Sequence, residues 1–244
     1  MNDWLEQIEL NGFTLIPSVF PRAIVDKLRN ELSIVIEQPP DLTNSIRKRN
    51  GAVYAARNVT KLVPAVRDVW NQQPLPELLA AVLGPVFGLV RVLYFDKPPE
   101  QTWALPWHKD RLIAIREPAG SSQRYSPVRD KAGVPHVEPP LEVLEAMLTL
   151  RIHLDDVTEE NGPLRVLPGS HHTGKVLLTD GMPDTVLARE GDVLVMRPLL
   201  AHTSGKSSPG TTRHRRILHL EFSSVIDLPD GYAWFEFVHR NFTG

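Results

Sequence analysis

The chain has 244 residues, of which 42% are hydrophobic and 23% charged, and its formal net charge is −2. A charge so near zero gives no reason to expect a nucleic-acid partner, and no apolar run is long enough for a transmembrane helix. Because the chain has no cysteine, disulfides and thiolate metal ligands are excluded, and any metal must be held by His, Asp, Glu or water. The acidic start MNDWLEQIEL does not resemble a signal peptide, and we therefore predict a cytoplasmic protein.

The first part of the chain, about residues 1–85, is predicted to be mainly helical. In PRAIVDKLRNELSIVIEQ, which begins at Pro21, apolar residues recur at helical spacing behind an N-terminal proline. A second helix is expected over residues 76–84, PELLAAVLG, because a proline opens this apolar segment and a glycine closes it.

Beyond the second helix the pattern changes to a period of two or to short apolar runs. Strands are therefore predicted over residues 88–95, 147–154, 164–168, 192–198 and 215–222. The 22 prolines and 15 glycines divide the chain into short elements, which is typical of an all-β core, here spanning about residues 88–225. Residues 117–140 show no periodicity and are predicted to form a long, lid-like loop within a single domain.

The segment LPWHKD, residues 105–110, contains the first candidate metal ligands. His108 and Asp110 stand two positions apart, and such residues point to the same face of a strand. His202, in MRPLLAHTSGKSS, follows another predicted strand and is the candidate third ligand. Two histidines and one carboxylate leave coordination positions open, as non-haem Fe(II) oxygenases require. Zinc accepts the same ligands, so spacing alone leaves the metal open.

Four segments resemble successive blocks of the phytanoyl-CoA dioxygenase family of iron(II)- and 2-oxoglutarate-dependent oxygenases. They are LYFDKPPEQTWALPWHKD, LTLRIHLDDVTEENGPLRVLPGSHHTG, GDVLVMRPLLAHTSGKSS and RHRRILHLEF. The resemblance extends from about residue 8 to about residue 222, and NGPLRVLPGSH is its most specific motif. It implies a mainly β fold with flanking helices, namely a double-stranded β-helix or cupin-like jelly roll. It also implies a small-molecule substrate, hydroxylated at an unactivated C–H bond with Fe(II), 2-oxoglutarate and O2, and with release of succinate and CO2.

The resemblance assigns roles to particular residues. His108, Asp110 and His202 correspond to the iron ligands, and Lys97 corresponds to a lysine that can reach the co-substrate. Thr149, on the predicted strand 147–154, carries a hydroxyl that can donate to a carboxylate, although a purely structural role is equally open for it. Related halogenases have a small residue in place of the aspartate, so Asp110 favours hydroxylation.

An arginine that follows the distal histidine is expected to bind the far carboxylate of 2-oxoglutarate, because its planar fork pairs with a carboxylate through two hydrogen bonds. Three arginines stand there: Arg213, Arg215 and Arg216. Strand alternation favours Arg215, which shares its face with the polar residues His219 and Glu221. Arg213 lies nearer to the histidine in the sequence and is the alternative.

Two other functional classes remain open on the sequence alone. One is a cupin-like metal enzyme that does not use 2-oxoglutarate, and the other is a non-catalytic jelly-roll binding module. The sequence indicates neither the substrate nor whether the outcome is hydroxylation or desaturation. A monomer and a homodimer are both compatible with it, and we expect no nucleic-acid or membrane partner.

Overall fold

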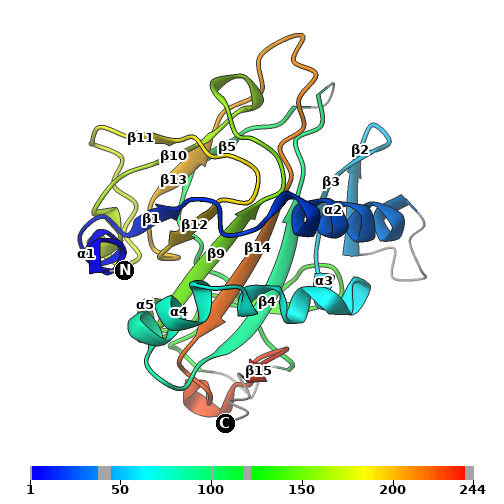
Figure 1. Ribbon diagram of the computed structural model, residues 1–244. Coiled ribbons are helices and arrows are strands. Elements are labelled where there is room, and N and C mark those ends of the chain that lie inside the picture. The colour runs from blue at the N-terminus through cyan, green and yellow to red at the C-terminus, as the bar shows by residue number, and fades with distance from the viewer. Residues whose placement is uncertain (1, 38–44, 100–101, 118–121, 240–244) are drawn as a thin grey trace.

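Two β-sheets form the framework of the computed structural model, which describes residues 2–37, 45–99, 102–117 and 122–239. In order across the major sheet lie β1 (Phe13–Ile16), β12 (Val193–Met196), β9 (Met147–His153), β14 (Ile217–Ser223), β4 (Gly88–Phe95), β3 (Ala52–Ala56) and β2 (Ile46–Arg49), while β15 (Val238–His239) also pairs with β4. The minor sheet consists of β11 (Asp184–Val186), β10 (Leu164–Val166), β13 (His202–Ser204) and β5 (Leu105–His108). Together they form the double-stranded β-helix expected from the sequence (Figure 1).

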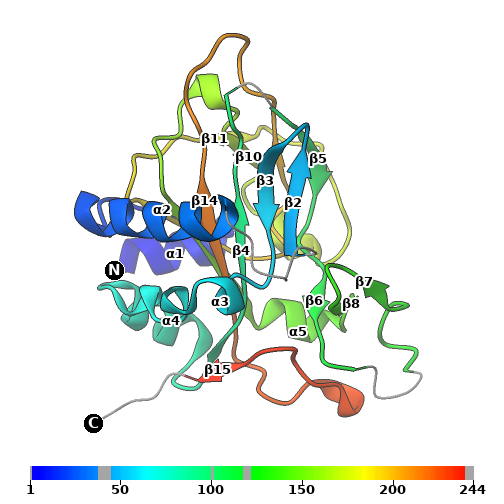
Figure 2. The same ribbon diagram turned by 90° about the vertical axis from the view of Figure 1, so that its right-hand side faces the viewer.

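Helices cover the outer face of the major sheet (Figures 1 and 2). They are α1 (Asn2–Leu10), α2 (Arg22–Glu37), α3 (Val59–Leu62) and α4 (Leu75–Leu83), and a short helix, α5 (Leu141–Glu145), precedes β9. The helices expected from Pro21 and over residues 76–84 are α2 and α4. None of the described helices is both long enough and apolar enough to cross a lipid bilayer.

The main hydrophobic core lies between these helices and the major sheet. Alternate side chains of the two central strands enter it, namely Leu148, Leu150 and Ile152 of β9 and Leu218, Leu220 and Phe222 of β14. Because successive side chains of a strand point to opposite faces, the intervening residues face the minor sheet. Those residues are largely polar, and they surround the candidate site described below.

The region expected to be mainly helical also contains the short strands β1, β2 and β3. β1 is the edge strand of the major sheet beside β12, and β2 and β3 form a hairpin at the opposite edge. The hairpin turns at Asn50 and Gly51, whose φ angles are 47° and 85°. Asn-Gly is the preferred pair for such a turn, because both positions need positive φ. The residues of β2 before the turn are mostly charged and hide the alternation of a strand.

The predicted loop over residues 117–140 is partly wrong. A small sheet in the order β6-β8-β7 includes its second half, with β6 (Ile113–Ala114), β7 (Arg129–Asp130) and β8 (Pro135–Val137). The chain reverses between β7 and β8 at Ala132 and Gly133, where φ is 62° and 73°. Alanine is an unusual residue for such a conformation, so the turn is not evident from the sequence. Residues 118–121 of the predicted loop lie outside the described residues.

The turn before β12 permits a stability prediction. Gly191 has a φ of +86°, and a Cβ added there would lie 2.2 Å from the carbonyl oxygen of Phe20. We expect Gly191→Ala to lower the free energy of unfolding by about 2–4 kcal/mol, because backbone strain and a clash with backbone combine. Gly51→Ala is the matched control, since its φ of +85° imposes similar strain but nothing lies within 4 Å of the added Cβ. If urea unfolding showed that both variants lose the same free energy of unfolding, the proposed clash at Gly191 would be contradicted.

Candidate metal centre

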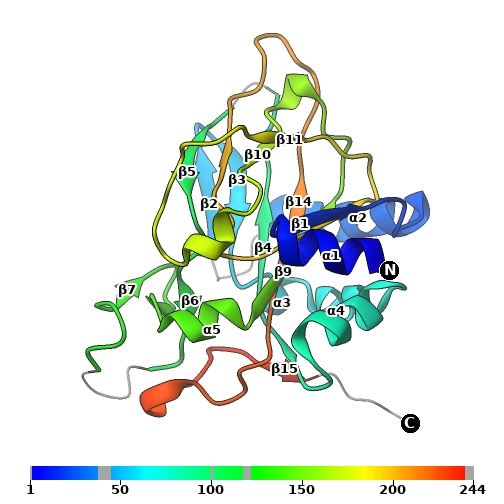
Figure 3. The same cartoon turned by 90° about the vertical axis from the view of Figure 1, so that its left-hand side faces the viewer.

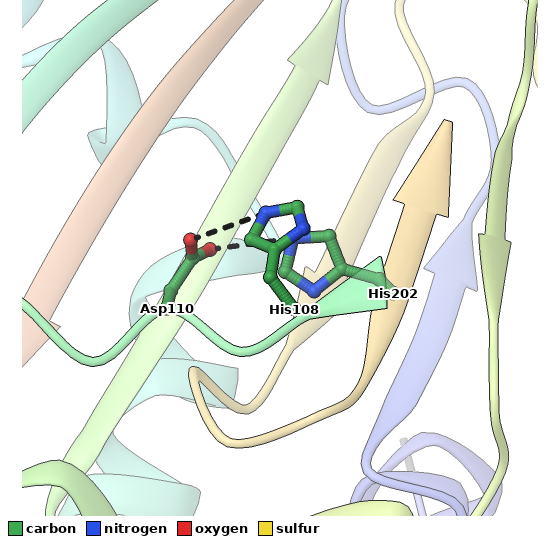
Figure 4. Close-up of side chains that lie close together, drawn as sticks. All are labelled: His108, Asp110 and His202. Carbon is green, nitrogen blue, oxygen red and sulfur yellow. Dashed lines mark ion pairs between the residues drawn. The ribbon is translucent and has the colours of Figure 1, made fainter. Parts of the chain in front are cut away.

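Three potential metal ligands converge where β5 and β13 pair. His108 and His202 are directly opposite each other in the antiparallel register, and their ring centroids are 4.2 Å apart. The Asp110 carboxylate lies 3.9 Å from Nε2 of His108 and 3.6 Å from Nε2 of His202 (Figure 4). One donor atom from each residue lies within 4.8 Å of the others. The ligand set expected from the sequence is therefore brought together in space.

Asp110 reaches this position differently from the expectation. The strand predicted to carry both ligands ends at His108, so the shared face of one strand does not explain the convergence. After the strand, the backbone N–H of Asp110 donates to the carbonyl of Pro198 at 2.9 Å. The ammonium of Lys109 donates to the carbonyls of Ser170 at 2.8 Å and Gly174 at 2.7 Å. These contacts turn the chain out of the sheet and fix the carboxylate beside both imidazoles.

Backbone carbonyls determine which nitrogen of each imidazole is free. Nδ1 of His108 lies 2.8 Å from the carbonyl oxygen of Pro106, and Nδ1 of His202 lies 2.9 Å from that of Leu200. A carbonyl oxygen can only accept, so each Nδ1 carries the proton and donates it. Nε2 of each ring then presents a lone pair toward the carboxylate, as metal-binding histidines require.

The charge states of the ligands also suit a cation. Burial lowers the pKa of His202 to about 4 despite the nearby Asp110, so this imidazole is neutral at pH 7. Burial acts to raise the pKa of Asp110, but the charges of His202 and other neighbouring side chains outweigh it and lower that pKa. The carboxylate is therefore ionised. Ligands must be deprotonated to bind a metal, and both already are.

A small inner cavity of about 60 Å³ borders all three ligands. Its wall includes Arg215, His219 and Glu221, and it also includes Arg151 of β9. Although β14 begins only at Ile217, the backbones of Arg215 and Lys97 exchange N–H to carbonyl hydrogen bonds of 3.2 Å, which extend the pairing of β14 with β4. The alternation of side chains therefore continues back to Arg215 and turns it into the cavity.

The structure distinguishes the three candidate arginines. Arg215 is 2% exposed, and its buried Nε has no hydrogen-bond partner among the described residues. Burial and the nearby Arg151 lower its pKa to about 9, which leaves the guanidinium charged at neutral pH. Arg213 is exposed and lies 3.8 Å from Glu160, and Arg216 pairs with Asp155 at 2.6 Å. Of the three, Arg215 is the one that lines the metal-site cavity.

A chain of buried polar contacts runs along the wall of the cavity. The guanidinium of Arg91 donates two hydrogen bonds to Glu221, at 2.8 and 2.5 Å. Nε2 of His219 donates to Glu221 at 3.2 Å, and Nη1 of Arg151 donates to Nδ1 of His219 at 3.3 Å. Glu221 is thus shared by an arginine and a histidine, while Arg151 has no carboxylate partner among the described residues. The wall therefore holds two cations, Arg151 and Arg215, that form no ion pair with another described residue.

The other two predicted co-substrate residues lie close to the cavity but do not form its described lining. Lys97 is fully buried, and its Nζ lies within hydrogen-bond distance of the carbonyls of Gly162 and Gly205 and of Ser204 Oγ. Thr149 is buried opposite Glu221 in the β9 and β14 register, and its hydroxyl has no hydrogen-bond partner among the described residues. The three donor contacts of Lys97 are made to the protein itself.

The buried position of Lys97 predicts a pH dependence of stability. Burial, with the charges of Arg215 and Arg151, lowers its pKa from 10.5 to about 6. Between these values the unfolded chain binds more protons than the folded chain, so the free energy of unfolding rises with pH. We expect Lys97→Met to reduce that slope by up to about 1.4 kcal/mol per pH unit, the share of one proton. Urea unfolding of the ligand-free protein between pH 6.5 and 8.5 measures it, with exposed Lys48→Met as control. If Lys97→Met left the slope of the free energy of unfolding against pH unchanged, the lowered pKa of Lys97 would be contradicted.

Sequence reasoning missed one feature of the site and left a second one open. Arg91 was not identified, although a single arginine within the apolar strand GLVRVLYF is a signal that one face of this strand is polar. Trp103, whose indole N–H donates to the Asp96 carbonyl at 2.7 Å, lines the cavity, whereas neighbouring Trp107 is not among the lining residues. Tryptophan occurs in cores and in sites alike, so the sequence could not separate the two.

Comparison with known proteins gives the following matches. The profile of the family described as phytanoyl-CoA dioxygenase (PhyH) matches residues 8–215. L-proline trans-4-hydroxylase of Streptomyces griseoviridis is 29% identical over 170 residues, which are 68% of this chain and 53% of that protein. The iron/alpha-ketoglutarate-dependent dioxygenase ausU of Aspergillus calidoustus is 26% identical over 234 residues, 89% of this chain and 69% of that protein. The chain thus spans about half to two thirds of these relatives.

Solved structures share the fold. The crystal structure of EctD from S. alaskensis in its apoform has a TM-score of 0.72 and 16% sequence identity. The match covers 98% of this chain and 84% of that one. At this identity the likeness concerns the arrangement of the sheets and helices.

Proposed function

Because the chain belongs to the phytanoyl-CoA dioxygenase family of iron(II)- and 2-oxoglutarate-dependent oxygenases, we propose that it is itself such an oxygenase, acting as one domain on a small molecule. The proposed reaction is hydroxylation of an unactivated C–H bond, with release of succinate and CO2. The observation that carries this proposal is the juxtaposition of the three-ligand cluster with the buried guanidinium of Arg215, whose Nε has no hydrogen-bond partner among the described residues.

The donor set fits ferrous iron. His108 and His202 direct free Nε2 atoms toward the ionised carboxylate of Asp110, and two imidazoles with one carboxylate are the ligands of non-haem Fe(II) oxygenases. We assign these three residues as the iron ligands. When bound, iron together with 2-oxoglutarate and O2 supplies the oxidising power that breaks the C–H bond. The protein orients the reactants and excludes water.

The cations of the inner cavity fit 2-oxoglutarate, which is a dianion. Burial of an arginine without a counter-ion costs free energy. A carboxylate that accepts hydrogen bonds from the planar guanidinium offsets this cost. We therefore assign Arg215 to the far carboxylate of the co-substrate. Lys97 and Thr149 lie beside this position and are proposed to support it. A cupin-like enzyme that does not use 2-oxoglutarate, or a module that binds no iron, would leave Arg215 unexplained.

Asp110 supports hydroxylation as the outcome. A carboxylate at this position occupies a coordination site that a small residue would leave open for a halide. The L-proline trans-4-hydroxylase to which the chain is similar is named for a hydroxylation of a small molecule, which supports the same type of reaction here.

An anaerobic titration tests the proposed function. We expect apo protein to bind Fe(II) and, after addition of 2-oxoglutarate, to develop the weak visible charge-transfer band of a keto acid chelated to ferrous iron. Exposure to O2 with a substrate should then release succinate. Iron binding without the band would favour the metal enzyme that does not use 2-oxoglutarate. If iron did not bind at all, the assignment of the three ligands would be wrong.

A further inference from the structure

A second, larger cavity of about 520 Å³ adjoins the metal site. It shares Arg91, Trp103, His108 and Asp110 with the inner cavity, so the two lie next to each other at the proposed metal ligands. Its volume falls in the range of small-molecule binding sites. A substrate that approaches the metal ligands from this side would occupy it.

The charge of this outer cavity is strongly unbalanced. Six of its lining residues are lysine or arginine, and a single one, the ligand Asp110, is acidic. Three of the six have partners elsewhere. Arg91 is neutralised by Glu221, Arg111 lies 3.5 Å from Glu138, and the ammonium of Lys109 is held by Ser170, Thr173 and Gly174.

The remaining three cations are Arg47, Arg57 and Lys131. None of them forms a side-chain hydrogen bond or an ion pair with another described residue. They come from three elements: β2, the end of β3, and the turn after β7. Figures 2 and 3 show the β2–β3 hairpin and the β7 segment on the same side of the molecule. We call these three residues the cationic cluster.

Burial and repulsion between neighbouring positive charges lower the pKa of two residues of the cationic cluster. Burial and the charges of Arg91 and Arg47 lower the pKa of Arg57, and burial with the charges of Arg57 and Arg91 lowers that of Lys131. Cations that face one cavity without forming an ion pair attract an anion, and a partly buried position strengthens that attraction relative to open solvent.

We propose that the cationic cluster binds an oxyanion group of the substrate, a carboxylate or a phosphate, and thereby points the rest of the substrate toward the metal ligands. Arg57 is taken as the central residue of this site, because it interacts electrostatically with both Arg47 and Lys131 and is partly buried. Tyr54 and Trp103, whose ring centroids are 6.3 Å apart, provide an aromatic wall for the uncharged part. This inference rests on the proposed function, which places the reaction at the metal ligands. It deepens that function by identifying the substrate as an anion.

The test uses acetate and methylphosphonate as probes for the two kinds of oxyanion. The protein is loaded anaerobically with Fe(II) and 2-oxoglutarate, so that Arg215 is occupied, and its thermal unfolding is followed with each probe against chloride at equal ionic strength. A ligand that binds only the folded state raises the Tm, and the dose dependence gives its affinity. The probe that binds more tightly identifies the carboxylate or the phosphate as the group recognised.

We expect Arg57→Gln to weaken probe binding about tenfold or more, because charge-assisted hydrogen bonds are lost. Lys131→Gln should weaken it as well, and it serves as the second variant if Arg57→Gln fails to fold. Arg165→Gln, which removes an exposed arginine of β10 outside the cavity, should bind the probe as the natural protein does.

Two results would overturn the inference: no stabilisation beyond that of chloride, or equal binding by Arg57→Gln, Lys131→Gln and Arg165→Gln. The charge-transfer band of the same samples separates this failure from that of the proposed function. If the band forms but neither probe binds, only the inference of an anionic substrate is refuted. If the band is absent, the proposed function fails, and the same titration of the apo protein still tests the cationic cluster.

Discussion

Asp110→Ala is expected to abolish iron binding and to lower succinate release more than 100-fold, while the fold remains intact. Asp110 supplies the carboxylate of the ligand set, and its side chain packs in no hydrophobic cluster. Changes to residues that merely orient a metal ligand typically cost about 10- to 100-fold in metal affinity or activity, so removal of a ligand should cost more. His108→Ala should have the same effect.

Equilibrium dialysis with Fe(II) under anaerobic conditions measures the first effect, and succinate release measures the second. Asp184→Ala, which removes an exposed carboxylate of β11, is the matched control and should bind iron normally. Circular dichroism should show the same folded content in all three proteins. Full activity of Asp110→Ala or of His108→Ala would refute the metal assignment.

Arg215→Gln is expected to raise the KM for 2-oxoglutarate by about 30-fold or more and to leave Fe(II) affinity nearly unchanged. Loss of one partner of a buried, hydrogen-bonded charge pair typically costs about 2–5 kcal/mol. The arginine side chain is buried and lines the cavity beside the proposed metal ligands, whereas its backbone hydrogen bonds to Lys97 can also be made by glutamine.

Arg213→Gln provides a close control, since it removes the same charge two residues away. Its side chain is 53% exposed and lies near Glu160, so its loss should leave the KM within about twofold of the natural value. The measurement is the dependence of succinate release on 2-oxoglutarate concentration, with iron affinity determined separately. An impaired Arg213→Gln beside a normal Arg215→Gln would exchange the two assignments.

The sequence was informative where a short pattern determines a local structure. The even-numbered apolar residues of β14, such as Leu218 and Leu220, predicted which face enters the core, and the same alternation placed Arg215 on the polar face. This reasoning succeeded because the pairing with β4 continues through Lys97, beyond the regular strand. Helices α2 and α4 were predictable for the same reason, since periodicity and terminal prolines act within one element.

What the sequence did not disclose depends on contacts between distant segments. Asp110 is positioned by the carbonyl of Pro198, 88 residues further along the chain, and strand geometry alone suggested a different explanation. The cationic cluster could not be found, because Arg47, Arg57 and Lys131 share no spacing and meet only when the β2–β3 hairpin and the turn after β7 fold toward one cavity. Within the 117–140 segment, the sequence alone did not show that Lys131, unlike its exposed basic neighbours, lines the cavity.

The hydrogen bonds that orient the two histidine ligands have an evolutionary consequence. Each Nδ1 donates to the carbonyl of the residue two positions earlier in its own chain segment, Pro106 or Leu200. Every amino acid has a backbone carbonyl, so this support does not depend on which side chain occupies either position. Mutations around the ligands can therefore accumulate without tilting the imidazoles. The walls of the cavity can therefore change while the two imidazoles of the proposed metal site keep their orientation.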